Sequence, residues 1–152
     1  MSRAERAKEL FLQGYACSQA VVLAFADVVG VDEATLAKIT LPFGGGLGRL
    51  RLTCGAVSGM AAVAGLLFSD AENSPENKKK TYAIVQELCG KFQEKNGSLI
   101  CSELLSGMKV PVEIGGEAEA RTAEYYKKRS CGDMVYYAVQ ILEDYLTEKG
   151  GV

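Results

Sequence analysis

The chain has 152 residues, of which 48% are hydrophobic and 24% charged, and its formal net charge is -2. This size and composition suit one globular domain, residues 1–152, with a single hydrophobic core. The slight negative charge argues against nucleic acid as a partner, because a phosphate-binding surface needs an excess of basic residues.

The chain contains five cysteines and no histidine. The missing histidine excludes the usual Ser-His-Asp and Cys-His catalytic arrangements, and also Cys/His zinc fingers. The most apolar run, residues 56–68, is too short to span a bilayer, and residues 1–10 lack the apolar stretch of a signal peptide. We therefore expect a cytoplasmic protein that is not membrane-embedded, with reduced cysteines that bind metal, catalyse or sense redox state.

The spacing of apolar residues predicts helices along the whole chain and no strand. Helices are expected over residues 2–12, 17–30, 32–39, 54–68 and 75–95, between residues 98 and 107, and over residues 117–129 and 130–148. Residues 108–117 are expected to form an irregular surface loop and residues 149–152 a frayed tail. The predicted fold class is an all-α single-domain bundle of about four longer helices with short accessory ones.

The segment from residue 43 to residue 68 begins with a glycine-rich run and continues through two arginines into an apolar helix. Thr53 is a plausible N-cap, which would make Cys54 the first helical residue. Gly55 and Gly59 lie four residues apart, so they share a helix face that another backbone can approach closely. That face could belong to a seam between two subunits, so a homodimer is one expectation.

The glycine-rich run resembles a phosphate-binding loop only superficially, since the Walker lysine and serine and a preceding strand are missing. We interpret Gly45, Gly46 and Gly55 instead as backbone that approaches the cysteine site and leaves amides free to bind sulfur or a cofactor. Arg49 and Arg51 would add positive potential there.

Four cysteines, Cys17, Cys54, Cys101 and Cys131, fall at predicted helix starts. A helix N-terminus carries roughly half a positive charge, which favours the thiolate and lowers its pKa. We therefore predict a thiolate-rich site centred on Cys54. The competing interpretation is that each cysteine is a small buried apolar residue, and this is the expected role of Cys89.

No pair of cysteines has CxxC spacing, so a shared site must be assembled by the fold. Four thiolates without histidine suit Zn or an iron–sulfur cluster, and they equally suit reversible disulfide exchange. The acidic residues Glu117, Glu119 and Glu124 are expected to form a solvated face. Tyr125 and Tyr126 are expected to be core or interface aromatics.

The cysteines and their contexts resemble the C-GCAxxG-C-C family of redox-active proteins over roughly residues 5–148. The resemblance rests on Cys17 in GYACSQAV, the CGAVSG run at residues 54–59, Cys101 in GSLICSELL, Cys131 in SCGDMVYYAV and the preceding GGGLGR run. The family name has Gly-Cys-Ala where this chain has Cys54-Gly55-Ala56. The resemblance implies a helical domain with a redox role and genes that often lie near those of transporters.

Two functions follow as hypotheses. The first is a redox-active or electron-transfer protein in which the four cysteines hold an iron–sulfur cluster or cycle between dithiol and disulfide with an unknown redox partner. The second is a non-enzymatic helical module that holds Zn or another thiophilic ion and assists a transporter. The cysteines could form one site or two.

Overall fold

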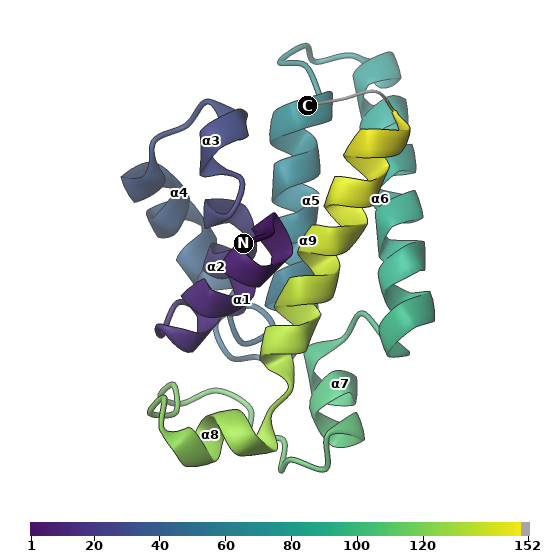
Figure 1. The fold of residues 1–152 in the computed structure, drawn as a ribbon. Helices are drawn as coiled ribbons and strands as arrows, with labels where there is room; N and C mark the ends of the chain where they lie inside the picture. The colour runs from purple at the N-terminus through teal and green to yellow at the C-terminus, as the bar shows by residue number, and fades with distance from the viewer. Residues whose placement is uncertain (150–152) are drawn as a thin grey trace.

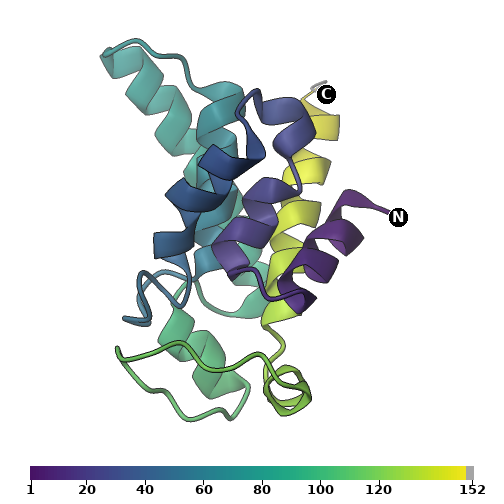
Figure 2. The same cartoon turned by 90° about the vertical axis from the view of Figure 1, so that its left-hand side faces the viewer.

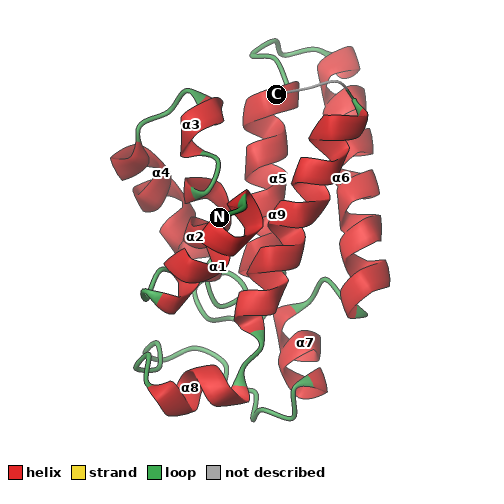
Figure 3. Cartoon of the chain, viewed as in Figure 1, coloured by secondary structure: helices red, strands yellow, loops and turns green. Residues whose placement is uncertain are grey.

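The computed structural model describes residues 1–149, and these residues form nine α-helices and one short 3-10 helix (Figure 1). The α-helices are α1 (Arg3–Leu12), α2 (Cys17–Leu23), α3 (Ala26–Val29), α4 (Glu33–Thr40), α5 (Gly55–Phe68), α6 (Pro75–Asn96), α7 (Cys101–Gly107), α8 (Ala123–Lys128) and α9 (Cys131–Glu148), and the 3-10 helix is Leu41–Phe43. Within the described residues no strand occurs, so the predicted all-α class is confirmed (Figure 3). Apart from Lys149, the predicted frayed tail at 149–152 lies outside the described residues.

Capping residues account for several helix boundaries. The Ser2 hydroxyl accepts a hydrogen bond from the Glu5 amide at 3.0 Å, and the Glu5 carboxylate accepts one from the Ser2 amide at 2.9 Å. Asp32 and Ser74 cap α4 and α6 in the same way, each through one side-chain oxygen. Gly97 ends α6 with a left-handed backbone, φ 92°, which glycine adopts without steric cost.

The helix predicted over residues 17–30 is broken into α2 and α3. At the break Phe25 has φ -105° and ψ 11°, outside the helical region, and its ring is fully buried. The guanidinium of Arg3 donates a hydrogen bond to the Ala24 carbonyl at 2.7 Å. The tertiary contact therefore satisfies a backbone group that a continuous helix would have bonded internally.

The core lies between α1, α2, α5, α6 and α9. Helix α2 packs against α5, α1 packs along α9, and α6 covers α5 and α9, as Figures 1 and 2 show from two sides. The largest fully buried side chains include Phe11, Phe25, Met60, Leu88 and Phe92. Burying each of them stabilises the fold by about 1.5–3 kcal/mol, before the loss of chain entropy is counted.

The small-residue face of α5 is used inside the chain. A Cβ atom on Gly59 would lie 2.9 Å from the Ser18 carbonyl oxygen and 3.1 Å from the Val21 Cβ, so α2 approaches α5 as closely as a glycine allows. The expected seam for a second subunit is therefore occupied by α2 of the same chain.

One end of the bundle carries the remaining elements. The N-termini of α5 and α9 lie at the lower end in Figure 1, together with α7, α8 and the glycine-rich loop. Residues 108–122 form no helix or strand, and α8 is shorter than the helix expected over residues 117–129. No helix within residues 1–149 is both long and apolar enough to cross a bilayer.

Candidate functional site

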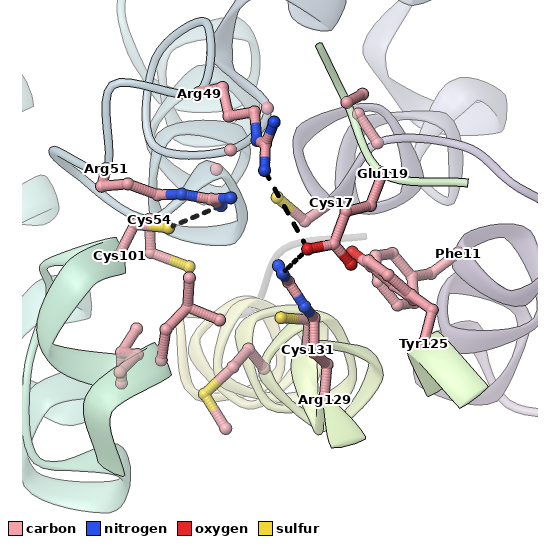
Figure 4. A pocket seen from close by; sticks show the side chains of 18 of the residues that line it. Phe11, Cys17, Arg49, Arg51, Cys54, Cys101, Glu119, Tyr125, Arg129 and Cys131 are labelled. Carbon is pink, nitrogen blue, oxygen red and sulfur yellow. Dashed lines mark hydrogen bonds and ion pairs between the residues drawn. The ribbon is translucent and has the colours of Figure 1, made fainter. Parts of the chain in front are cut away.

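A cavity of about 310 Å³ lies at this end of the bundle. Its wall brings together four cysteines, four arginines, one glutamate and one tyrosine from five helices and two loops: Cys17, Cys54, Cys101, Cys131, Arg49, Arg51, Arg121, Arg129, Glu119 and Tyr125. Figure 4 shows the four cysteine side chains reaching this space from separate elements. All four are free thiols, of which Cys54 is buried and the others half-buried.

The cysteines occupy helix starts, as the sequence indicated. Cys17, Cys101 and Cys131 are the first residues of α2, α7 and α9. Cys54 is the N-cap of α5 and Gly55 is its first helical residue, so the expected cap at Thr53 is wrong by one position.

A short backbone pairing explains why Thr53 is not a cap. Thr53 forms an isolated antiparallel bridge with Ile100, immediately before α5 and α7 begin. The Cys54 amide donates to the Leu99 carbonyl at 2.8 Å, and the Cys101 amide donates to the Leu52 carbonyl at 2.6 Å. Because side chains alternate along extended backbone, this pairing places Cys54 and Cys101 on the same face of the bridge.

The three glycines named from the sequence each border a cysteine or an arginine of the cavity. A Cβ on Gly55 would lie 2.4 Å from the Cys17 sulfur, and one on Gly46 would lie 2.6 Å from the Cys101 Cβ. Gly45 has φ 65°, and its backbone amide favours the thiolate of Cys17 and so lowers the pKa of that thiol. Gly55 therefore lies against the side chain of Cys17, and Gly46 lies against that of Cys101.

Arginines supply the charge of the cavity. Arg51 is 5% exposed, donates from Nε to the Glu113 carbonyl at 3.0 Å, and donates from Nη1 to the Cys101 sulfur at 3.7 Å. Arg121 ties the 108–122 segment to the end of α1, donating to the carbonyls of Phe11 at 3.0 Å and Tyr15 at 3.1 Å. The sequence placed Arg49 and Arg51 here, but it gave no signal for the distant Arg121 and Arg129.

Glu119 is exposed, as the prediction of a solvated face requires, but it also lines the cavity, which the sequence did not indicate. Its carboxylate lies 2.7 Å from Arg129 and 4.0 Å from Arg49, across the cavity (Figure 4). Tyr125 also lines the cavity, where the guanidinium groups of Arg121 and Arg129 stack over its ring at 5.1 and 4.8 Å. Burial raises the pKa of Tyr125, and the charge of a Cys131 thiolate raises it further, so the hydroxyl stays protonated.

The expected lowering of the thiol pKa values by helix N-termini is reversed at Cys17 and Cys54. Burial raises the pKa of Cys17, the Gly45 amide opposes this, and the charge of Cys101 raises the pKa further. Burial raises the pKa of Cys54 well above its ordinary range, and the Cys17 charge adds to this, against the Ala56 amide at the start of α5. Desolvation of the thiolate outweighs the helix amides at both positions.

Cys131 behaves in the same way. Burial, with the charges of Cys17 and Cys101, raises its pKa to about 12, although Arg129 and Arg121 act in the opposite direction. Cys17 and Cys131 each interact electrostatically with the other three thiols, so the charges single out neither of them and do not favour Cys54, which the sequence had suggested as the centre.

The cysteines do not fit a metal centre as they are arranged. Within residues 1–149, no group of three or more cysteine, aspartate or glutamate side chains is placed to hold one ion. A Zn or iron–sulfur site needs thiolate sulfurs within about 2.3 Å of the metal. Cys89 lies apart from the cavity, half-buried on α6 and packed against the core, which agrees with the packing role expected for it.

The fold and the cavity define the class: an all-helical protein whose candidate site consists of four thiols and an arginine-lined cavity. Residues 15–145 match the family model described as "Putative redox-active protein (C_GCAxxG_C_C)". The chain therefore belongs to this family, and the resemblance inferred from the cysteine motifs is confirmed. No curated protein and no solved structure matches the chain.

Proposed function

We propose that the protein is a thiol–disulfide redox protein in which Cys101 is the attacking thiol and Cys17 the resolving one. The observation that supports this most strongly is the hydrogen bond from Arg51 to the Cys101 sulfur in a cavity lined by three further free thiols. A cationic donor at sulfur stabilises the thiolate, which is the nucleophile in disulfide exchange. Membership of a family described as redox-active is consistent with this chemistry.

The reaction consumes a disulfide substrate and the protein dithiol. The Cys101 thiolate attacks one sulfur of the substrate, the S–S bond breaks, and the leaving thiolate takes up a proton. Cys17 then loses its proton and attacks the Cys101 sulfur, releasing the second half of the substrate as a thiol. The products are one protein disulfide and two small thiols, so two electrons and two protons pass from protein to substrate.

We choose Cys17 as the resolving thiol because it lines the same cavity as Cys101 and the Gly45 amide favours its thiolate. The charge of Cys101 raises the pKa of both Cys17 and Cys131, so a Cys101–Cys131 disulfide in the peptide map would replace Cys17 in this role. Cys54 and Cys131 take no step in this scheme. Burial raises the pKa of Cys17 as well, but it raises those of Cys54, well above the ordinary range, and of Cys131, to about 12, more strongly, so these two stay neutral thiols in the cavity wall near pH 7. A reducing compartment and a dithiol partner that regenerates the reduced form complete the proposed cycle.

The test combines cysteine variants with peptide mapping of the oxidised protein. The reduced protein is mixed with a small disulfide, and we expect a Cys17–Cys101 disulfide. Cys101→Ser should lose exchange, whereas Cys17→Ser should accumulate a mixed disulfide on Cys101, and Cys89→Ser serves as the matched control. A Cys101→Ser protein that exchanges at the unaltered rate would overturn the assignment.

The metal alternatives have a separate test. Protein purified without oxygen is analysed for iron and zinc and by its absorption spectrum. We expect neither metal at one ion or cluster per chain. Stoichiometric iron or zinc that is lost in a Cys54→Ser variant would replace the dithiol scheme with a thiolate metal site, and light scattering of the same sample would show whether the protein is a dimer.

A further inference from the structure

The cavity wall carries more positive charge than its own side chains neutralise. Four arginines line it, and Glu119 is the one carboxylate among the lining residues. Glu119 is shared between Arg129 and Arg49, and Arg49 also lies 3.3 Å from the Glu113 carboxylate. These contacts account for Arg49 and Arg129 and leave Arg51 and Arg121 without an acidic partner among the described residues.

Arg51 is the most informative of the four because it is 5% exposed and lies next to the sulfur of Cys101. Removing a guanidinium from water is unfavourable unless hydrogen bonds and an opposite charge compensate for it. The two hydrogen bonds that Arg51 donates end on a carbonyl and on the sulfur of Cys101, so no carboxylate balances its charge within residues 1–149. A Cys101 thiolate balances it only until the thiolate is consumed in forming a disulfide, and the guanidinium then lacks a counter-charge. A bound anion would supply it.

Glu119 shows which kind of anion the cavity accepts. Its carboxylate crosses the cavity to lie between two guanidinium groups (Figure 4). Planar guanidinium groups bind both carboxylates and phosphates through paired hydrogen bonds, and the position of Glu119 shows that this cavity accommodates a carboxylate. The N-termini of the long helices α5 and α9 face the same space and add to the positive potential.

We propose that the substrate is a small disulfide bearing carboxylate groups, held by Arg51 with its S–S bond beside Cys101. This proposal rests on the thiol–disulfide function proposed above and adds the class of substrate. The cavity of about 310 Å³ lies at the lower end of the range for small-molecule sites, so the substrate is small. Glu119 competes with the substrate carboxylate for Arg129 and Arg49.

The first experiment compares three small disulfides that differ in charge. The reduced protein is mixed with dithiodiglycolate, bis(2-hydroxyethyl) disulfide or cystamine, which are anionic, neutral and cationic at pH 7. After correction for their rates with a free model thiol, we expect the anionic disulfide to react at least about tenfold faster than the cationic one at low salt. The ratio should shrink as salt screens the arginines. Equal corrected rates, or a faster cationic disulfide, would overturn the proposal.

Variants then locate the charge that is responsible. Arg51→Gln should lower the anionic-to-cationic rate ratio about tenfold, whereas Arg51→Lys should keep most of it because the charge remains. Glu119→Gln should raise the ratio by freeing Arg129 and Arg49. Arg6→Gln, an exposed arginine outside the cavity, is the matched control. If Arg51→Gln does not fold, an unchanged ratio in Glu119→Gln still contradicts the proposal.

A measurement without redox chemistry separates the two proposals. Adipate matches dithiodiglycolate in length and charge but has carbon in place of sulfur. We expect adipate to raise the melting temperature of the reduced protein and to slow alkylation of Cys101, with neither effect in the Arg51→Gln variant. Adipate binding without any disulfide exchange would keep the anion site and remove the thiol–disulfide function. Disulfide exchange at equal corrected rates for the three disulfides, without adipate binding, would keep the thiol–disulfide function and remove the anion site.

Discussion

Replacing Gly55 with alanine tests the contact between α5 and the Cys17 sulfur. The added Cβ would lie 2.4 Å from the Cys17 sulfur, 2.8 Å from the Phe43 carbonyl oxygen and 3.3 Å from the Ser18 amide nitrogen. Two of these three neighbours are backbone atoms, which move less readily than the end of a flexible side chain. The sulfur can rotate away only by leaving its position beside the Gly45 amide.

The size of the effect follows from two opposing contributions. Overpacking a well-filled site costs about 1–3 kcal/mol. Alanine also loses less backbone entropy on folding than glycine, which returns about 0.5–1 kcal/mol at a position such as Gly55 whose φ is not in the left-handed region. Because two of the contacts would be shorter than 3.0 Å, we expect an overpacking cost in the upper half of this range and a net loss of about 1–2 kcal/mol in the free energy of unfolding. For a protein of this size that corresponds to a fall in melting temperature of about 2–8 °C.

The assay is thermal and urea unfolding under reducing conditions, with Gly90→Ala as the control. Gly90 lies within α6, and a Cβ there meets nothing within 4 Å, so alanine should stabilise the protein by about 0.5–1 kcal/mol. The rate of Cys17 alkylation should change in Gly55→Ala and stay constant in Gly90→Ala. If Gly55→Ala is as stable as the unaltered protein and its Cys17 reacts at the same rate, the packing argument is refuted.

Three further predictions concern pH, core packing and ion pairing. The pKa of Cys131 is raised to about 12 in the folded chain, so above about pH 9 the folded state holds more protons than the unfolded one. The free energy of unfolding, measured by urea titration with reductant, should therefore fall from pH 8 to pH 10. A flat profile would contradict this. Cys89→Ala should leave disulfide exchange unchanged and cost less than about 2 kcal/mol by urea unfolding. Arg3→Met should lower the free energy of unfolding by about 1–2 kcal/mol, because Arg3 pairs with Asp27 at 2.5 Å and Glu143 at 2.6 Å. Disulfide exchange should stay unchanged, and a loss of exchange would show that this contact reaches the cavity.

The helices were predictable because their signals are local. Ser2, Asp32 and Ser74 cap helices through atoms within three residues, and Gly97 ends one through its own backbone. The position of Cys54 was less predictable. Its helix begins one residue late because Thr53 pairs with Ile100, and no local pattern reports a bridge between residues so far apart in the chain.

The charged part of the cavity was hidden from the sequence for a related reason. Glu119 and Arg129 lie in a polar stretch that is typical of a solvated surface, and only the path of residues 108–122 brings them over the thiols. The thiol pKa values were misjudged because the helix N-terminus is visible in a sequence, whereas the burial that outweighs it is a property of the fold.

The two arginines that follow the glycine-rich loop lie at backbone positions that are unfavourable for a residue with a side chain. Leu47, Arg49 and Arg51 have φ values of 71°, 67° and 63°, a left-handed conformation that costs a residue with a side chain roughly 1–2 kcal/mol. Glycine at Arg49 and Arg51 would remove that cost, so relief of strain alone does not favour arginine. The Arg51 amide donates to the Gly45 carbonyl at 3.1 Å and the Gly115 amide donates to the Arg49 carbonyl at 2.9 Å, which holds the strained backbone in place. The loop therefore keeps unfavourable backbone angles at the two positions that place arginines in the cavity wall, as expected where charge at a site matters more than local stability.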